Sequence, residues 1–271
     1  MKHGKHLDLE NHPLIVIKYG GNAMVDEARQ QAFAKDVVAL WQAGMKVVVV
    51  HGGGPQVDEL LEKINHPSQR IDGMRVTDAV TLQIAEMVLT GGVGKALVNH
   101  IHQAGGLAVG LNGKDGQLLI AHKLTAEVDL GFVGQIDSVN PNVLFSLLEA
   151  GFIPVIAPIA GSTDGTSYNI NADLAAGAIA KALNADEFLL LSNIDGVLDK
   201  NGVLLSELST ADIDALIKDG TIYGGMIPKL AGAVEAINAG LDSVTILNGM
   251  KDNACSQKLS GANIGTRISR H

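Results

Sequence analysis

Residues 46–61, KVVVVHGGGPQVDELL, decide the fold because they join a strand, a glycine loop and a helix. The aliphatic run that ends at His51 predicts a strand buried on both faces, as in parallel sheets. Gly52-Gly53-Gly54 follows as a loop, and Pro55 suits the first turn of the next helix. A glycine loop at this junction presents backbone N–H groups that suit anions. The stretch therefore predicts an α/β fold with a ligand at the end of this strand.

Composition supports this fold class and narrows the partners. Apolar residues make up 46% of the 271 residues and aromatics only 3%, so the core must be built from aliphatic side chains. The net charge of −9 argues against a nucleic-acid partner, because phosphate binding needs a basic surface. No apolar run reaches the roughly 18 residues needed to span a bilayer, so no membrane partner is expected.

Cysteine content and the N-terminal residues predict a cytoplasmic protein. Cys255 is the only cysteine, which excludes an internal disulfide and fits a reducing compartment. The first 13 residues lack the apolar stretch of a secretory signal. They contain His3, His6 and His12, but histidines on a short polar tail are more typical of solvated residues than of a metal site. We expect no metal held by protein ligands alone.

Short aliphatic runs alternate with helical patterns, and this predicts a mainly parallel open sheet between two helical layers, an αβα sandwich. The expected strands are residues 14–19, 47–51, 107–111, 153–157, 187–192 and 243–247, with a short hairpin strand at 204–205. The expected helices are residues 26–42, 55–64, 141–150, 172–183, 210–218 and 228–239, and helical periodicity also fills 77–102.

The alternation breaks after residue 111. A turn signal at 113–116 lies between two apolar runs, which predicts β-hairpins inserted at the edge of the sheet. A stretch rich in Gly, Ser, Thr and Asn near 160–171 then marks the expected seam between an N-terminal lobe, 1–170, and a C-terminal lobe, 171–271.

Other glycine motifs fit this chain poorly. Residues 90–97, TGGVGKAL, lack the first glycine of a Walker loop, where Leu89 stands, and Ala96 replaces its hydroxyl. We expect a helix there, with glycines at a close packing surface. No dinucleotide-binding G-x-G-x-x-G follows the first strand. The HGGG of some esterases requires a G-x-S-x-G nucleophile, which is also missing.

Four glycine pairs or runs remain as candidate strand-end loops: Gly20-Gly21, Gly52–Gly54, Gly91-Gly92 and Gly224-Gly225. The first two follow strands and precede helices, at the sheet edge where α/β proteins bind ligands. Any one of them could be only a tight turn. Together they suggest a ligand with more than one anionic group.

Two lysines occupy costly positions. Lys18 lies one residue from the end of a strand that otherwise reads LIVI, so its charge needs a partner, a ligand or an edge strand that faces water. Lys229 lies in the first turn of a helix, where a cation opposes the dipole by roughly 0.3–1 kcal/mol unless an anion docks there.

Asp173 could orient both lysines or simply cap its helix. Arg75 could bind a substrate carboxylate through a bidentate pair of hydrogen bonds, or it could form a surface ion pair.

Six motifs, in this order and spacing, resemble the amino acid kinase family: IKYGGNAM, VVVVHGGGPQVD, DGMRVTD, YNINAD, LLLSNIDGVLD and GGMIPK. The resemblance extends from about Leu14 to Asn248. It implies an αβα fold whose lobe 1–170 binds an acyl amino acid and forms a homodimer interface, while lobe 171–271 binds ATP. The reaction it implies is transfer of the γ-phosphoryl group of ATP, brought with Mg²⁺, to the γ-carboxylate of N-acetyl-L-glutamate, the second step of arginine biosynthesis.

By match to these motifs, Lys18 and Lys229 would stabilise the transferring phosphoryl group and Asp173 would organise them. The acceptor would be bound by Gly53, Gly54, Arg75 and Asn169. The nucleotide would be bound by Gly20, Gly21, Asn193, Ile194, Asp195, Gly196, Val197, Leu198, Thr221, Ile222 and Tyr223. Whether Gly52–Gly54 also contacts the γ-phosphoryl group is left open by the sequence.

The residues themselves suit this chemistry. A γ-carboxylate with an ordinary pKa of about 4.3 is already ionised at neutral pH, so no general base is required. The barrier is one anion attacking another, which calls for positioning, cations and N–H donors. Two other activities stay open: a kinase for a related acid such as an N-blocked aminoadipate, and a non-catalytic amino-acid or nucleotide sensor.

Some features depart from the family pattern. Asn193 stands where many members have aspartate, which leaves its nucleotide contact open. Arginine-inhibited, hexameric members carry a longer N-terminal helix and a different C-terminal ending. These departures favour a homodimer over a hexamer, and the sequence leaves arginine inhibition open.

Overall fold

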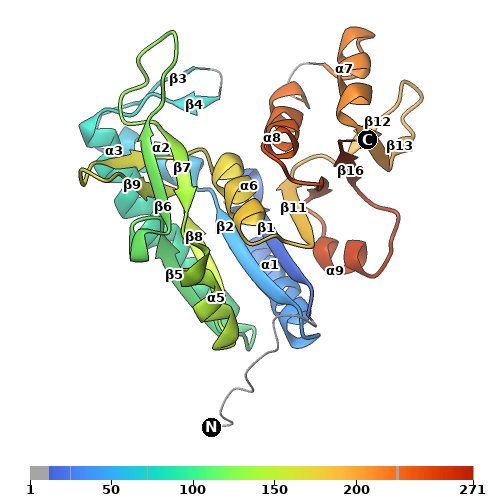
Figure 1. Cartoon of the computed structure of the whole chain (residues 1–271), viewed down its shortest axis with the longest axis horizontal. Helices are drawn as coiled ribbons and strands as arrows, with labels where there is room; N and C mark the ends of the chain where they lie inside the picture. Colours follow the sequence, from blue (N-terminus) through green and yellow to red (C-terminus); the bar gives the residue numbers. More distant parts are fainter. Residues whose placement is uncertain (1–11, 25, 72, 224–225, 271) are drawn as a thin grey trace.

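An eight-stranded sheet forms the centre of the molecule (Figure 1). The computed structural model describes residues 12–24, 26–71, 73–223 and 226–270. Along the sheet the strand order is β14-β16-β15-β11-β1-β2-β8-β5, and neighbours are parallel except for β15 and β16. The strands are β1 (Leu14–Tyr19), β2 (Lys46–His51), β5 (Ala108–Asn112), β8 (Ile153–Ala157), β11 (Glu187–Ser192), β14 (Glu207–Ser209), β15 (Ser243–Asn248) and β16 (Thr266–Ser269).

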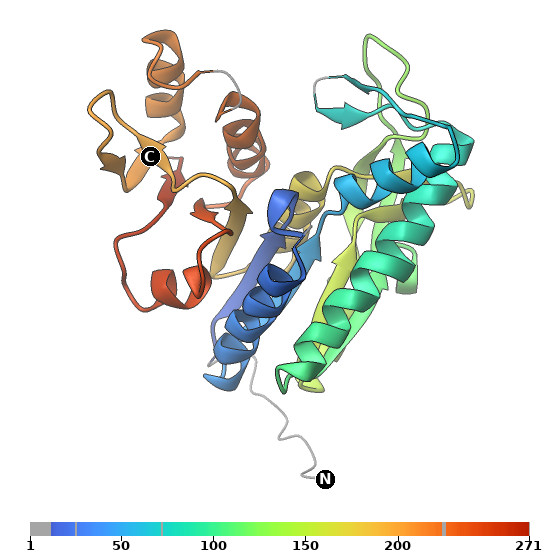
Figure 2. The same cartoon turned by 180° about the vertical axis from the view of Figure 1, so that it is seen from behind.

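Helices cover both faces of this sheet. Figure 1 looks onto α5, α6 and α8, and Figure 2 shows α1 and α4 on the opposite face. The helices are α1 (Glu27–Gln42), α2 (Gly54–Lys63), α3 (Ala79–Glu86), α4 (Gly94–Gln103), α5 (Pro141–Glu149), α6 (Ala172–Ala182), α7 (Thr210–Lys218), α8 (Ile227–Asn238) and α9 (Ala254–Leu259). None of the described helices is long and apolar enough to cross a membrane.

Alternate residues of the central strands face two separate cores, as the pleat of a strand requires. Val16, Val48 and Val50 pack with α5, α6 and α8. Ile15 and Ile17 pack on the other side with α1 and α4. The aliphatic runs read from the sequence are therefore strands buried on both faces, and the predicted αβα sandwich is confirmed.

A second sheet of four strands, β10-β9-β6-β7, lies beside the first (Figure 1). Its strands are β6 (Leu119–Lys123), β7 (Gly134–Val139), β9 (Ile159–Gly161) and β10 (Ser167–Asn169). The predicted antiparallel hairpin insertion is confirmed, but it belongs to this second sheet and not to the edge of the main sheet. The turn at 113–116 carries the chain from β5 into the second sheet, where the Gly113 N–H donates to Ile159 O at 2.6 Å. The hairpin partners are β6 and β7.

Two short hairpins complete the fold, β3 (Arg70–Ile71) with β4 (Met74–Arg75) and β12 (Val197–Leu198) with β13 (Leu204–Leu205). Most predicted elements lie within two residues of the observed ones. The segment 77–102 is not one α-helix, since a π-helical turn, Met87–Val93, joins α3 to α4. The predicted seam near 160–171 stays a prediction, and the main sheet continues across it through the pairing of β1 with β11.

Candidate active site

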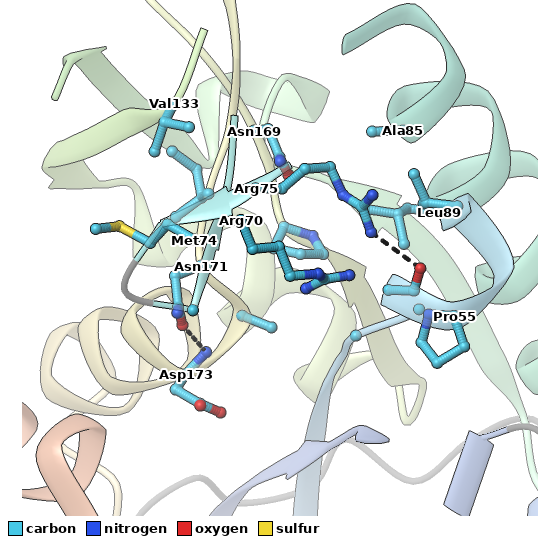
Figure 3. Close-up of a pocket in the computed structure, with 18 of the residues that line it drawn as sticks. Pro55, Arg70, Met74, Arg75, Ala85, Leu89, Val133, Asn169, Asn171 and Asp173 are labelled. Atoms are coloured by element: carbon cyan, nitrogen blue, oxygen red, sulfur yellow. Dashed lines mark hydrogen bonds between the residues drawn. The ribbon is translucent and has the colours of Figure 1, made fainter. Parts of the chain in front are cut away.

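A cavity of about 470 Å³ opens at the carboxyl ends of β1 and β2 (Figure 3). Its walls come from the two loops that follow these strands, the β3–β4 hairpin, the helical segment 85–89 and the start of α6. Seven residues predicted from the sequence line it: Lys18, Gly21, Gly53, Gly54, Arg75, Asn169 and Asp173. The structure therefore brings together most of the residues predicted for the acceptor and the phosphoryl group.

Lys18 points its ammonium group toward Asp173, with Nζ 2.9 Å from Oδ1. The alternative that Lys18 lies on an edge strand is wrong, because β1 pairs with β11 through Leu190 and with β2 through Val50. Its side chain is only 13% exposed. A Cβ atom on Gly20 would lie 2.6 Å from Nζ, so this glycine leaves the space that the ammonium group occupies.

Asp173 is not the cap of α6. That role belongs to Asn171, whose Oδ1 accepts from the N–H groups of Asp173 at 2.8 Å and Leu174 at 3.3 Å (Figure 3). The Asp173 carboxylate is thus available to Lys18. Gly232 of α8 lies close by, because a Cβ atom there would be 3.2 Å from the Asp173 Cβ. An Asn before an Ala-rich helix was a usable cap signal that sequence reasoning missed.

The Gly52–Gly54 loop is tightly held between its neighbours. Gly52 donates its N–H to Tyr19 O at 2.8 Å, which ties the loop after β2 to the end of β1. Gly53 has φ 148° and ψ 24°, and a Cβ atom on it would lie 2.6 Å from Leu89 Cδ2. Only glycine fits this position, because any larger residue would meet both strain and a clash.

His51, the residue before this loop, is completely buried. Its Nδ1 lies 2.7 Å from Gly52 O, and its Nε2 has no hydrogen-bond partner among the described residues. Burial lowers the pKa of His51 to about 4, so the ring is neutral at neutral pH. A Cβ atom on Gly94 would lie 3.0 Å from Nε2, which explains this one glycine of TGGVGKAL.

The other glycines of that motif differ from our expectation. Gly91 and Gly92 do not form a strand-end loop, because they lie inside the π-helical turn Met87–Val93. They do not form a packing surface either, since a Cβ atom on each would meet no atom within 4 Å. Helical periodicity does not distinguish a π-helical turn from an α-helix, and the turn is visible only in the structure.

Arg75 is buried, with 7% of its surface exposed, so it is not part of a surface ion pair. Its Nη1 contacts the carboxylate of Asp58 and donates to Ser68 Oγ at 2.6 Å, and its Nη2 donates to Gly54 O at 3.0 Å. These contacts orient the guanidinium toward the glycine loop, as Figure 3 shows. Arg70 also binds Asp58, with Nη2 2.6 Å from Oδ2.

Asp58 therefore holds two arginines. Partial burial raises its pKa, but the hydrogen bonds from Arg75 and Arg70 outweigh burial and keep the pKa below its ordinary value. Sequence reasoning missed Asp58 as a site residue, although it stands one helical turn after Gly54 and so shares its side of α2. Arg70 gave no such signal, because its pairing with Arg75 depends on a strand of two residues.

Asn169 reaches the cavity from β10. Its Nδ2 donates to Thr77 Oγ1 at 3.2 Å, and the Thr77 hydroxyl donates to Arg75 O at 2.7 Å. Thr77 is completely buried. The two predicted acceptor ligands are therefore held in fixed relation by one buried hydroxyl.

Of the predicted nucleotide residues, Gly20 and Gly21 follow β1 and Gly21 lines this cavity. The others lie elsewhere, after β11 and around the end of α7, and none of them lines it. Asp195 accepts from Asn248 Nδ2 and from Lys251 Nζ, each at 2.7 Å, and the Lys251 contact is the main cause of its lowered pKa. Gly196 has φ 132°, and the Val197 N–H donates to Thr266 Oγ1 at 2.7 Å. The members of this segment are Asn193, Ile194, Asp195, Gly196, Val197 and Leu198.

The segment 221–223 has mixed exposure. The Thr221 hydroxyl donates to Asp219 Oδ1 at 2.6 Å, Ile222 is buried, and Tyr223 is 73% exposed. Lys200 lies 3.1 Å from Asp219, so an ion pair links this segment to the loop beyond 193–198. This ion pair joins residues that flank the two predicted nucleotide segments, and Val197 and Ile222 of these segments belong to the same hydrophobic core.

Three predicted residues are not fully described. Gly224 and Gly225 lie outside the described residues, and so does the side chain of Lys229. Lys229 belongs to the first turn of α8, as predicted. The idea that Asp173 organises both lysines stays a prediction, with its Lys18 half visible as an ion pair.

Comparisons with known proteins bear on this arrangement. Residues 13–248 match the sequence profile of the amino acid kinase family. A protein named acetylglutamate kinase from Vesicomyosocius okutanii is 52% identical over 264 residues, which cover 94% of this chain and 85% of that protein. The solved structure of smu.665 from Streptococcus mutans UA159 is 32% identical with TM-score 0.77, covering 95% of this chain and 99% of that chain.

A further solved structure shows the likeness of fold alone. It is N-acetylglutamate synthase from Neisseria gonorrhoeae, complexed with coenzyme A and N-acetyl-glutamate, at TM-score 0.82 and 24% identity. The alignment covers 96% of this chain and 60% of that chain.

Proposed function

The chain belongs to the amino acid kinase family, and we propose that it is an ATP-dependent N-acetyl-L-glutamate 5-kinase. The reaction transfers the γ-phosphoryl group of ATP to the γ-carboxylate of N-acetyl-L-glutamate and yields N-acetylglutamyl 5-phosphate, the second step of arginine biosynthesis. One observation carries the proposal: the Lys18–Asp173 ion pair, the Gly53-Gly54 loop and the buried Arg75 all line a single cavity.

The cavity suits a short dicarboxylate with an acyl group. Arg75 offers a planar, permanently charged donor set, which matches the α-carboxylate of the acceptor. Neither Gly53 nor Gly54 donates its N–H to an acceptor among the described residues, so both are free for the γ-carboxylate. Met74, Leu89 and Val133 contribute apolar surface for the methylene and acetyl groups. Asn169 supplies an amide beside Arg75.

The chemistry requires charge neutralisation more than proton transfer. The ionised γ-carboxylate attacks the γ-phosphorus while the bond to the β-phosphate oxygen breaks, and the products are the acyl phosphate and ADP. Lys18 stabilises the negative charge on the transferring group. Asp173 holds the Lys18 ammonium in place, and in this proposal Lys229 approaches the same group from α8.

ATP would extend from the phosphoryl site toward the segments 193–198 and 221–223, with Gly20-Gly21 near its phosphates. Mg²⁺ would enter with ATP, because it prefers phosphate oxygens and water to an all-protein cage. The residues present fit this arrangement: the cavity carboxylates, Asp58 and Asp173, are already paired with cations. The ion would neutralise phosphate charge.

We further propose that the protein is a cytoplasmic homodimer. For the homodimer, the supporting observation is that Val80 and Met87, seven residues apart on α3 and the π-helical turn, are 44% and 52% exposed. Apolar side chains at this spacing share one helix face and suit a second copy of the chain. Sedimentation equilibrium of the purified chain distinguishes a dimer from a monomer.

The activity is tested with ATP, Mg²⁺ and a panel of acceptors: N-acetyl-L-glutamate, N-acetyl-2-aminoadipate and free L-glutamate. We expect ADP release together with a hydroxylamine-trappable acyl phosphate, and the highest kcat/KM with N-acetyl-L-glutamate. A higher kcat/KM with the aminoadipate would move the assignment to the related kinase. Binding of ligands by folded protein without either product would instead identify a sensor.

A further inference from the structure

We propose that His51 is a positioning residue for the phosphoryl transfer, because it fixes the Gly52–Gly53 peptide so that the Gly53 N–H faces the cavity. The inference deepens the proposed function and rests on it, since the N–H group matters only if an anionic acceptor binds there. It assigns a task to the histidine of the HGGG segment, which the reaction itself does not use.

The first step is the tautomer of the ring. Gly52 O is a carbonyl oxygen and can only accept, so the hydrogen of the 2.7 Å contact belongs to His51 Nδ1. Nε2 is buried and has no partner among the described residues. A second proton there would leave a buried charge unpaired, which is costly. The ring is therefore neutral and carries its proton on Nδ1.

The second step is the direction of the peptide. The C=O of Gly52 and the N–H of Gly53 belong to one peptide unit, which is trans, and point in opposite directions. Because the C=O points to His51, the N–H points away from the buried ring, and Gly53 lines the cavity. The N–H of Gly52 is bound to Tyr19 O, so the loop is held on both sides of this residue.

The third step is the support behind the ring. Gly94 begins α4, and because it has no side chain it leaves space for His51 Nε2. An ideal Cβ atom on Gly94 would lie 3.0 Å from Nε2. Leu89 and Val93, in the π-helical turn just before Gly94, pack against Gly53. An ideal Cβ atom on Gly53 would lie 2.6 Å from the side chain of Leu89 and 3.2 Å from that of Val93. One segment that contains a π-helical turn thus holds both the ring and the loop, and such turns are frequent at functional sites.

The test compares two substitutions of similar size, His51→Asn and His51→Leu. The Asn amide keeps a donor close to the position of Nδ1, whereas Leu has none, and both leave a similar void. We expect His51→Leu to lower kcat about 10- to 100-fold, somewhat less than removal of an oxyanion donor itself. His51→Asn should stay within about threefold of the wild type, and the KM for ATP should change little in either variant.

Equal losses of kcat in the two variants, or an unchanged kcat in His51→Leu, would overturn the proposal. Long-range ¹⁵N–¹H NMR of the wild-type protein supplies a second test that needs no variant to fold. We expect the proton of His51 on Nδ1, and a proton on Nε2 alone would overturn the inference. If the wild type makes no acyl phosphate, the proposed function fails, while the NMR result still decides whether the peptide is fixed.

Discussion

The acceptor side and the nucleotide side of this molecule hold their predicted residues in different ways. On the acceptor side, charged side chains are paired before any ligand binds, Lys18 with Asp173 and Arg75 with Asp58, and Arg75 is buried while its three companions are partly buried. On the nucleotide side, Val197 and Ile222 belong to the core, and Tyr223 is largely exposed. The side chains of Val197 and Ile222 therefore contribute packing, and we expect nucleotide recognition there to depend on backbone groups of the loops.

This difference has an energetic reason. A buried charge pair costs desolvation, which is repaid only when its geometry is good and further hydrogen bonds complete it. Arg75 meets that condition through Ser68 and Gly54. The acceptor side thus has its charges in place before binding, as electrostatic catalysis requires. In the proposed reaction the nucleotide would bring its own charges and Mg²⁺, so we expect its side to need mainly shape and N–H donors.

The largest effect is expected from Lys18→Ala. The substitution removes a cation that we propose stabilises the transferring group, and it leaves the partly buried Asp173 carboxylate without the partner seen in the structure. We expect kcat to fall about 10²- to 10³-fold, the scale of losing one transition-state donor. Steady-state kinetics measure it, with Lys63→Ala as control, because the ion pair of Lys63 is with the exposed Glu59 one turn away. Near wild-type turnover in Lys18→Ala would refute the role given to this lysine.

A smaller and more selective effect is expected from Arg75→Lys. Lysine keeps the charge but loses the planar fork, so the contacts with Asp58, Ser68 and Gly54 cannot all persist. We expect the KM for N-acetyl-L-glutamate to rise about 10- to 100-fold, as for one or two charged hydrogen bonds, while the KM for ATP stays nearly constant. Thermal unfolding of the variant separates this loss from simple destabilisation. Equal rises in the KM for N-acetyl-L-glutamate and the KM for ATP would contradict the assignment of Arg75 to the acceptor side.

The parts of the fold that follow from the sequence are those with strong local patterns. LIVIKY, VVVVH and EFLLLS are aliphatic runs in or beside the centre of the sheet, and no other element type accommodates them so well. The strand β16 was missed because TRIS is short, polar at three of its four positions and antiparallel to its neighbour β15. Its pairing with β14 and β15 joins segments that are distant in the sequence, and no local pattern encodes such a pairing.

The candidate site, like the fold, was predictable from the sequence only in part. Lys18 and the glycine loop were predictable because a charge at the end of a buried strand and glycines after it both need an explanation. Asp173 alone did not show whether it caps α6 or pairs with a lysine, since a carboxylate early in a helix satisfies either role. The neighbour Asn171 decides it by accepting the N–H groups of the first turn, and an Asn before an Ala-rich helix is the sequence signal that could have indicated this.

The smallest effect is expected from Gly196→Ala on the nucleotide side. Gly196 has φ 132°, and a Cβ atom would lie 2.6 Å from Thr266 Oγ1, the group that accepts the Val197 N–H. The substitution should displace the loop 193–198 and raise the KM for ATP about threefold to tenfold, with the acceptor KM unchanged. Gly202→Ala is the matched control, because Gly202 also has positive φ, 79°, but no atom within 4 Å of an ideal Cβ. If both variants raise the KM for ATP equally, backbone strain alone is responsible; if neither does, the loop 193–198 does not bind the nucleotide.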